Sequence, residues 1–256
     1  MTKTALVTGA TSGIGNALAK LLAADHYDLI LVSRDDEKMR AIKSELTDRS
    51  VTIIKKDLSQ FHAAKEVFDE VKRNGLTIDL LINNAGFGLV GAFDSLPIER
   101  QSEMIQLNCA ALTELTYYFL PDLRSKMGKI MNVASTAAYQ PGPFMAVYFA
   151  SKAYVLSLSE ALAEELDKSG VTVTALCPGP THTNFGSVAH AENIKMFSRT
   201  MDVQTVARIG YRAMMKGKRV VVTGQLNYAG AIAAKLLPRR WGAKAVRIIT
   251  GSNKKK

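Results

Sequence analysis

The sequence predicts a single α/β domain built on a doubly wound, mainly parallel sheet of seven strands, with helices on both faces. Short β-favouring runs alternate with segments of helical period from residue 4 to residue 223. The runs are nearly continuously apolar, as expected of strands that are buried on both faces. A glycine-rich turn separates the first run from the first helical segment. The length of 256 residues suits one domain of this kind.

Each element is predicted from its residue pattern and from the turn residues around it. Strands are expected at residues 4–8, 29–32, 51–54, 79–82, 129–133, 171–176 and 219–223. Helices are expected at residues 16–24, 37–46, 63–73, 98–120, about 148–168, and 202–215. Asn74-Gly75 is a typical C-cap pair for the third helix. Asn108 interrupts the long fourth helix, where it could bend the helix or present its amide to another group.

Two segments near the C-terminal end have weaker patterns. Residues 180–200 are polar with little helical or strand period, and we interpret them as a lid or substrate loop. Residues 225–256 form an extension in which apolar residues alternate with basic ones around Pro238. This basic amphipathic segment could lie on an anionic membrane or meet a phosphate-bearing carrier. Alternatively, it is a terminal helix that packs over the substrate pocket with its lysines in solvent.

The composition is that of a globular cytoplasmic protein. Hydrophobic residues make up 47% and charged residues 22% of the chain, and no run approaches the ~18 apolar residues of a membrane helix. The apolar run at residues 5–7 is too short for a signal-peptide core. The widely separated Cys109 and Cys177 are expected to be buried thiols. We interpret His182 and His190 as polar loop residues, and we expect no metal site.

The net charge of +10 is concentrated in the tail. Residues 203–256 contain 13 lysines and arginines and no acidic residue, which leaves 20 basic against 23 acidic residues in the first 202. A nucleic-acid-binding domain would carry basic residues across its recognition elements. The distribution therefore argues against nucleic acid as a partner.

The turn after the first strand, Gly9-Ala10-Thr11-Ser12-Gly13-Ile14-Gly15, has the composition of a dinucleotide-binding loop. Glycines there permit a tight reversal and a close approach of the backbone to a pyrophosphate, and the following helix presents its N-terminus to the anion. The alternative is an ordinary strand-to-helix turn that is rich in glycine. About 20 residues further on, Ser33 and Arg34 end the second strand where an acidic residue would select NAD. Arg34 suits a 2′-phosphate and favours NADP(H), unless it is simply a solvated residue.

Tyr148 and Lys152 are four residues apart, which places both side chains on one face of a helix. A free tyrosine has a pKa of about 10, so proton transfer near neutral pH requires the phenolate to be stabilised, and a neighbouring ammonium supplies part of that. We therefore expect Lys152 to lower the pKa of Tyr148. Ser135 follows the fifth strand and should reach the same carboxyl edge of the sheet, although it could equally be a cap.

Taken together, these motifs resemble the short-chain dehydrogenase/reductase family. The resemblance covers residues 1 to about 225 and rests on the order and spacing of these segments: Thr8-Gly9-Ala10-Thr11-Ser12-Gly13-Ile14-Gly15, Asn83-Asn84-Ala85-Gly86, Asn108, Ser135, Tyr148-x-x-x-Lys152 and Pro178-Gly179. It implies a Rossmann fold and a carbonyl reductase that also works as an alcohol dehydrogenase. Tyr148 would be the general acid and base, Ser135 would bind the substrate oxygen, and Asn108 would hold a water that connects Lys152 to solvent.

The resemblance also implies the residues that bind the cofactor. They are Gly9, Thr11, Ser12, Gly13, Ile14, Gly15, Ser33, Arg34, Asp57, Leu58, Asn84, Ala85, Gly86, Tyr148, Lys152, Pro178, Gly179 and Thr181. The expected function is therefore an NADP(H)-dependent oxidoreductase of a fairly apolar substrate such as a 3-oxoacyl or ketosteroid-like compound. The alternative is a non-catalytic NADP(H)-binding sensor or scaffold. The family also implies a homodimer or homotetramer paired through the long helices near Leu112 and Leu158.

Overall fold

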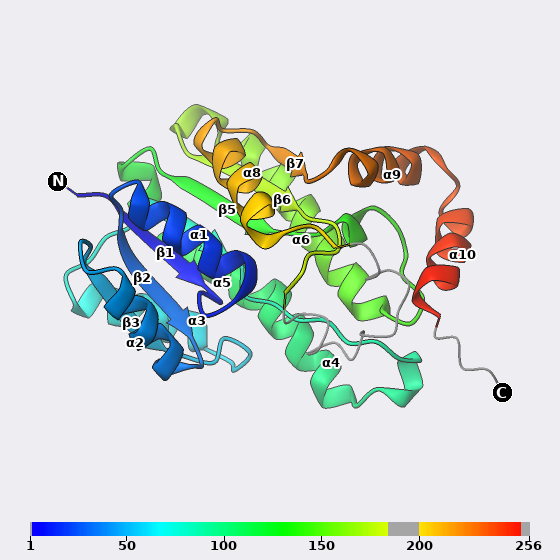
Figure 1. Cartoon of the computed structure of the whole chain (residues 1–256), viewed down its shortest axis with the longest axis horizontal. Helices are drawn as coiled ribbons and strands as arrows, with labels where there is room; N and C mark the ends of the chain where they lie inside the picture. Colours follow the sequence, from blue (N-terminus) through cyan, green and yellow to red (C-terminus); the bar gives the residue numbers. More distant parts are fainter. Residues whose placement is uncertain (1, 184–199, 252–256) are drawn as a thin grey trace.

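The computed structural model describes residues 2–183 and 200–251. Its sheet has seven strands in the order β3-β2-β1-β4-β5-β6-β7, and every pair of neighbours is parallel (Figure 1). The strands are β1 (Thr4–Thr8), β2 (Asp28–Ser33), β3 (Val51–Lys55), β4 (Leu80–Asn83), β5 (Lys129–Val133), β6 (Thr172–Cys177) and β7 (Val220–Val222). The chain winds outward from β1 in one direction and from β4 in the other, so the strand order reverses between β1 and β4. Ligands of such sheets bind beyond the carboxyl ends of the strands at this reversal.

Helices cover both faces of the sheet, as predicted. Successive residues of a strand point to opposite faces, and in β1 Val7 packs in one apolar cluster while Leu6 packs in another. The cluster around Val7 includes residues of α1 (Gly13–Ala24), α2 (Asp36–Glu45) and α8 (Val203–Met215). The cluster around Leu6 includes residues of α3 (Ala63–Arg73), α5 (Leu112–Ser125) and α6 (Ala146–Glu165). Both clusters are fully buried, which holds the strand ends in fixed positions.

The helix predicted at residues 98–120 is not one regular helix. It consists of α4 (Ile98–Ile105), a π-helical segment η2 (Gln106–Ala111) and α5, which continues to Ser125 through Pro121. Asn108 lies inside η2 and is 1% exposed. A π turn accommodates one extra residue per turn and often marks a functional site. The asparagine therefore coincides with a distortion of the helix, as its poor helix propensity suggested.

The described residues also include short 3-10 segments, and helix α1 starts earlier than predicted. The 3-10 segments are η1 (Phe93–Ser95), η3 (Thr136–Tyr139) and η4 (Asp167–Ser169). Helix α1 starts at Gly13, three residues before the predicted start, because the last two glycines of the turn belong to the helix itself. Most of the expected lid, residues 184–199 with His190, lies outside the described residues. Its flanks are joined by a parallel bridge between Thr181 and Met201.

The C-terminal extension forms two helices, α9 (Gln225–Leu236) and α10 (Arg239–Thr250), separated at Pro238. Figure 1 shows α9 extending from β7 beyond the sheet, with α10 at its outer end. Val246 and Thr250 of α10 are buried, and the Thr250 hydroxyl donates a hydrogen bond to the carbonyl of Pro143. One part of the second interpretation of the tail, a terminal helix that packs against the body of the protein, is therefore confirmed. Among the helices that the structure describes, none is long and apolar enough to cross a membrane.

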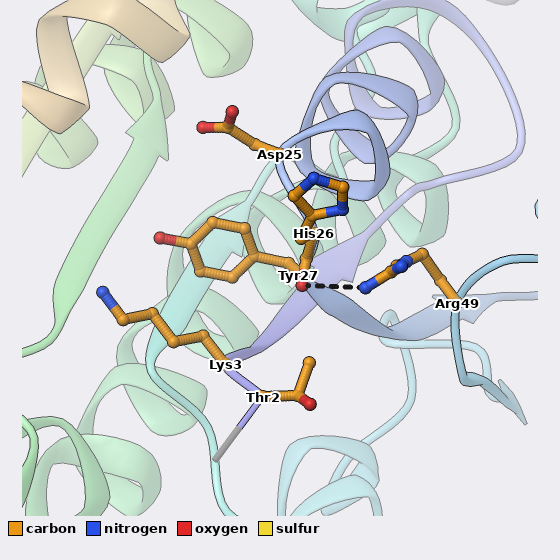
Figure 2. Close-up of a pocket in the computed structure, with 6 residues that line it drawn as sticks. All are labelled: Thr2, Lys3, Asp25, His26, Tyr27 and Arg49. Carbon is orange, nitrogen blue, oxygen red and sulfur yellow. Dashed lines mark hydrogen bonds between the residues drawn. The ribbon is translucent and has the colours of Figure 1, made fainter.

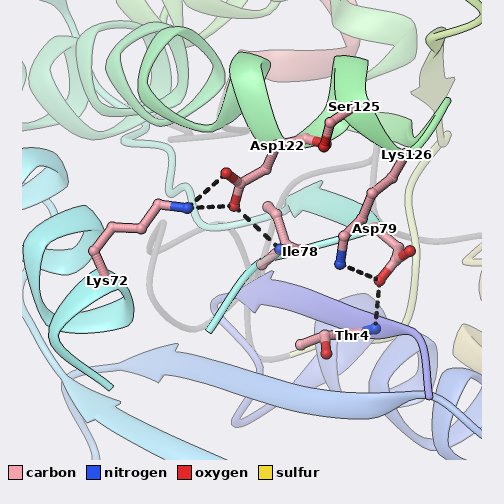
Figure 3. Close-up of polar contacts among 7 residues, drawn as sticks. All are labelled: Thr4, Lys72, Ile78, Asp79, Asp122, Ser125 and Lys126. Carbon is pink, nitrogen blue, oxygen red and sulfur yellow. Dashed lines mark hydrogen bonds and ion pairs between the residues drawn. The ribbon is translucent and has the colours of Figure 1, made fainter. Parts of the chain in front are cut away.

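The amino edge of the sheet carries polar features of its own. A hollow of about 630 Å³ lies there, before the starts of β1, β2 and β3, and Arg49 donates a hydrogen bond to the His26 carbonyl at its rim (Figure 2). Two partly buried carboxylates connect neighbouring segments at the same edge (Figure 3). Asp79 accepts from the Thr4 amide, and Asp122 of α5 accepts from Lys72 of α3 and from the Ile78 amide. These contacts position elements from the side opposite to the carboxyl edge.

Candidate active site

Four side chains predicted to be catalytic meet at the carboxyl edge of the sheet. Ser135 follows β5, Tyr148 and Lys152 lie in the first two turns of α6, and Asn108 belongs to η2. The four-residue spacing on α6 puts the Lys152 ammonium 5.9 Å from the centroid of the Tyr148 ring. Asn108, Ser135 and Tyr148 are separated in the sequence. They lie together because the parallel sheet places the carboxyl ends of β4, β5 and β6 side by side.

Ser135 is a cap and also lies beside Tyr148. Its backbone is extended and it caps η3, where its Oγ accepts a hydrogen bond from the Ala137 amide at 3.1 Å. The same side chain forms a hydrogen bond with Tyr148 that acts to lower the tyrosine pKa. Its Oγ also lies 3.4 Å from the Pro178 carbonyl, to which it can donate. The cap therefore fixes the position of a hydroxyl that faces the tyrosine.

Burial, and not the lysine charge, dominates the ionisation of Tyr148. Removal of the phenolate from water raises the pKa of Tyr148 to about 12, and the hydrogen bond from Ser135 opposes that rise. This direction is the reverse of the one expected from the sequence. The ammonium of Lys152 does not offset the loss of hydration, so the spacing alone was a poor guide to the acidity of the phenol.

Lys152 is buried, with 6% of the residue exposed. Its Nζ donates a hydrogen bond to the carbonyl of Val133 at 2.7 Å, the last residue of β5. Burial lowers the pKa of Lys152 to about 8, and the nearby thiols of Cys109 and Cys177 act in the opposite sense. The lysine is therefore close to its titration point near neutral pH, which is unusual for an ammonium.

Asn108 is held by the backbone of the segment after β4. Its Nδ2 donates to the Phe87 carbonyl at 3.0 Å and its Oδ1 accepts from the Phe87 amide at 3.1 Å. The same Nδ2 donates to the Ser151 hydroxyl at 3.0 Å, and that hydroxyl donates to the Tyr148 carbonyl. The Asn108 side chain thus connects η2, the cofactor-side loop and α6. Sequence reasoning missed Ser151, whose position three residues after Tyr148 was the available signal.

The glycine turn has the geometry that close approach to an anion requires. Gly9 has a φ of 63°, in the left-handed region where a Cβ is unfavourable. A Cβ on Gly15 would lie 2.4 Å from the Nδ2 of Asn84 and 2.4 Å from the Gly9 carbonyl oxygen. Ser12 occupies the N-cap of α1 without a side-chain cap, so the first turn keeps its amide groups for another acceptor. The turn therefore fits a phosphate group of a dinucleotide.

Asn84 and Ala85 are tied to the turn by Thr8. The Asn84 amide side chain donates to the carbonyls of Thr8 and Gly9, and the Ala85 backbone amide donates to the Thr8 hydroxyl. Gly86 lies next to Asn108, whose Oδ1 would be 2.8 Å from a Cβ at that position. The residues after β4 that were predicted to bind the cofactor therefore lie between the glycine turn and the cluster that contains Asn108 and Tyr148.

The ends of β2 and β3 place the predicted ribose and adenine residues next to each other. The hydroxyls of Thr11 and Ser33 are 3.0 Å apart. The Arg34 side chain is 70% exposed and lies 3.8 Å from the carboxylate of Asp57. Leu58 is buried. Arg34 is therefore accessible from solvent and only loosely paired with Asp57.

Pro178, Gly179 and Thr181 follow β6 at the same edge. Thr181 is buried, and its hydroxyl donates to the Gly179 carbonyl at 2.9 Å. A Cβ on Gly179 would lie 2.2 Å from the Nδ2 of Asn227, which belongs to α9. Sequence reasoning missed Asn227, because its contact with Gly179 joins segments that are far apart in the chain.

Apolar side chains pack around Tyr148. Tyr148 and Val90 pack against a buried cluster that contains residues of η3, α6 and α10. The buried members are Ala137, Met145, Phe149 and Val246. The contribution of α10 was not identified from the sequence, since nothing in the pattern of the tail says which part of the molecule it covers.

Comparisons with known proteins match most of the chain to one family. A family model described as short chain dehydrogenase matches residues 3–193. An uncharacterized oxidoreductase of Schizosaccharomyces pombe is 33% identical over 187 residues, which cover 72% of this chain and 62% of the yeast protein. The chain thus spans less than two thirds of that relative's length.

Solved structures of similar proteins cover most of the chain. A short-chain dehydrogenase from Sphingobium yanoikuyae in complex with NADPH is 29% identical, with a TM-score of 0.81 over 91% of this chain and 93% of that one. A bulky-bulky ketone specific alcohol dehydrogenase from Comamonas testosteroni is 29% identical, with a TM-score of 0.77 over 91% and 92% of the two chains.

Proposed function

Because the chain belongs to the short-chain dehydrogenase/reductase family, we propose that it is an NADP(H)-dependent oxidoreductase that interconverts a carbonyl and a secondary alcohol. The observation that carries the proposal is the convergence of Tyr148, Ser135 and Lys152 beside the glycine turn. Two hydroxyl groups that face each other at a sheet edge can bind one substrate oxygen from two sides. That is the arrangement needed where charge changes on the oxygen during reduction.

Each residue has a definable part in the reaction. In the direction of reduction, the Tyr148 hydroxyl gives its proton to the carbonyl oxygen, and in oxidation it takes the proton back. Ser135 donates a hydrogen bond to the same oxygen and stabilises the negative charge that develops there. Lys152 holds a proton close to Tyr148, and its lowered pKa of about 8 makes it suited to return that proton after turnover.

The cofactor would be held by residues of the glycine turn and by residues at the ends of β2, β3, β4 and β6. When bound, the nicotinamide nucleotide supplies the hydride for reduction or accepts it in oxidation. The positive φ of Gly9 and the lack of room for a Cβ at Gly15 fit a pyrophosphate against the N-terminus of α1. Arg34 would bind the 2′-phosphate, which is why we favour NADP(H).

We propose a fairly apolar substrate, such as a 3-oxoacyl or ketosteroid-like compound. The side chains that pack with Tyr148 are apolar, and one of them, Val246, comes from α10. The similarity to an alcohol dehydrogenase specific for bulky-bulky ketones is consistent with a site of this kind. Residues that line the rest of the substrate site belong in part to the expected lid, most of which lies outside the described residues.

The test of the reaction is the replacement Tyr148→Phe, which removes only the hydroxyl. We expect kcat for ketone reduction, followed by NADPH absorbance, to fall by about 10²- to 10⁴-fold, because the general acid is lost. NADPH should still bind, because the other predicted cofactor-binding residues are intact. Tyr154→Phe is the matched control, since Tyr154 lies on the same helix but is 43% exposed and bonded to Thr113.

The same experiment separates the enzyme from the alternative, a non-catalytic sensor or scaffold. Turnover by the Tyr148→Phe variant at the wild-type rate would contradict the proposed mechanism. NADPH binding by the wild-type protein without oxidation of the nucleotide, across a panel of linear, cyclic and steroid ketones, would favour the sensor.

The cofactor preference is tested by Arg34→Ala. Loss of one charged hydrogen bond to phosphate costs about 1.5–3 kcal/mol, so the affinity for NADPH should fall by roughly 10- to 100-fold while that for NADH stays the same. Arg40→Ala is the control, because the Arg40 side chain is 72% exposed and lies on the neighbouring α2. Equal binding of both nucleotides by the wild-type protein would show that Arg34 does not select the cofactor.

A further inference from the structure

The two C-terminal helices expose large apolar side chains to solvent. On α9 Leu226 is 82% and Leu236 is 81% exposed, and on α10 Trp241 is 66% and Ile248 is 72% exposed. Such residues cost free energy in water and, where they gather, mark a surface that contacts something else. The outer surface of α9 and α10 is called here the C-terminal face.

The exposed residues of α10 lie on one side of the helix and the buried ones on the other. Val246 and Thr250 are four residues apart and are buried against the body of the protein. Trp241 and Ile248 are seven residues apart, or two turns, and therefore share the opposite side. Helix α10 therefore has a second apolar side, which is exposed to solvent. Packing against the domain does not explain why these residues are apolar.

The charges on the C-terminal face are all of one sign. Apart from Lys235, whose ammonium lies over the ring of Tyr139 in η3, the exposed charged residues of α9 and α10 are Arg239, Arg240, Lys244 and Arg247. Residues 203–256 contain no Asp or Glu. Lys244 lies between Trp241 and Ile248 along the outer side of α10. Apolar residues, a tryptophan and basic residues on one helical surface are the features of helices that lie in the interface of an anionic bilayer.

We propose that the C-terminal face docks the protein onto the surface of a membrane that contains anionic lipid. The apolar side chains would enter the boundary between headgroups and acyl chains, and the lysines and arginines would meet lipid phosphates. A second copy of the chain fits this face less well, because a symmetric pair would bring the same basic residues against each other. This inference does not depend on the reaction proposed above.

Docking in this way would bring the catalytic site close to the lipid. The inner side of α10 contributes Val246 to the apolar cluster against which Tyr148 packs. The membrane surface and this apolar cluster would then be separated by about the 10 Å diameter of one helix. A substrate dissolved in the bilayer would have a short path to the tyrosine.

Trp241 is the only tryptophan of the chain, so its fluorescence reports on the C-terminal face alone. The full-length protein is titrated with vesicles of phosphatidylcholine and with vesicles of phosphatidylcholine and phosphatidylglycerol. We expect a blue shift of the emission and co-flotation only with the anionic vesicles, both reversed as the salt concentration is raised from about 0.05 to 0.5 M. Brominated lipids should quench the emission.

Two variants locate the binding surface. Lys244→Glu/Arg247→Glu should weaken binding to anionic vesicles by at least about tenfold, whereas Lys43→Glu/Lys168→Glu, the same charge change at exposed positions of α2 and η4, should weaken it much less. Ile248→Ser should also weaken binding, and Met127→Ser, at a residue that is 71% exposed, should not. Circular dichroism and turnover of a water-soluble ketone show that each variant is folded.

Several outcomes would overturn the inference. These are no shift with anionic vesicles, equal binding to both kinds of vesicle, or equal loss of binding in the two charge-reversal variants. A blue-shifted emission without vesicles that depends on protein concentration would assign the face to a second copy instead.

Discussion

At the scale of single residues, burial decides the ionisation of the two groups on α6. The charged forms of Tyr148 and Lys152 lose their hydration when they are buried. Burial therefore raises the pKa of Tyr148 to about 12 and lowers the pKa of Lys152 to about 8. The phenol and the amine are thus both shifted toward their neutral forms. A bound substrate oxygen and a cofactor are the partners that could favour proton transfer between them.

The lowered pKa of Lys152 predicts a dependence of stability on pH. An unfolded lysine titrates near 10.5 and the folded one near 8, so between these values the unfolded chain holds more protons. Stability contributed by this residue therefore rises from pH 8 toward pH 10.5, and below pH 8 the buried charge costs on the order of 3 kcal/mol. We expect Lys152→Met to remove that rise.

Urea unfolding of the wild-type protein and of Lys152→Met at pH 7.5 and pH 9.5 checks this. The wild-type free energy of unfolding should increase relative to that of the variant at the higher pH. Lys168→Met, at an exposed lysine, serves as the control. Parallel behaviour of wild type and Lys152→Met would show that Lys152 titrates normally in the folded protein.

At the scale of elements, helices are fixed to the sheet at both of its edges. At the carboxyl edge the Asn108 side chain joins η2 to the backbone of Phe87 and to Ser151 of α6. At the amino edge Asp122 joins α5 to Lys72 of α3 and to the Ile78 amide just before β4 (Figure 3). The π turn lies between these attachments and keeps Asn108 aimed at the site.

Removal of the Asp122 carboxylate tests the attachment at the amino edge. Its side chain is 12% exposed, so Asp122→Ala leaves a backbone amide and an ammonium without their acceptor. We expect a loss of about 1–3 kcal/mol in the free energy of unfolding, measured with urea. Asp69→Ala, which removes the exposed pair with Lys65 within α3, should cost only about 0.3–0.5 kcal/mol. Equal losses would show that Asp122 acts as an ordinary surface charge.

At the scale of the whole molecule, we propose that exposed apolar residues on α4, α5 and α6 form the interface of the homodimer or homotetramer that the family resemblance implies. Ile105 is 51%, Tyr117 is 75% and Tyr154 is 43% exposed, and a hydrogen bond between Thr113 and Tyr154 places α5 beside α6. Leu112 is the first residue of α5, and Leu158 belongs to α6. This surface is mixed in polarity and differs from the basic C-terminal face, so the two can contact different partners.

An arginine in that surface should dissociate the oligomer. Tyr117→Arg would bury unpaired charge in the interface, and we expect light scattering after size exclusion to show a shift toward the mass of a monomer. Phe61→Arg, at a residue that is 79% exposed on the loop after β3, is the control and should leave the mass unchanged. An unchanged mass for Tyr117→Arg would place the interface elsewhere or show a monomer.

The sequence by itself determined the fold class and predicted Asn108, Ser135, Tyr148 and Lys152 as one site, but it did not identify Ser151, Asn227 or the contribution of α10. Apolar runs, glycine turns and helical spacing are local patterns, and in a parallel sheet they place every strand end at one edge, which is how Ser135 and Tyr148 were found. Only the tertiary structure revealed the π turn around Asn108 and the hydrogen bond from Lys152 to the Val133 carbonyl. It also showed that the pKa of Tyr148 is raised and not lowered. It also decided that α10 packs against the tyrosine. The physical reason is that desolvation and contacts between distant segments depend on which surfaces meet, and no local period of the sequence records that.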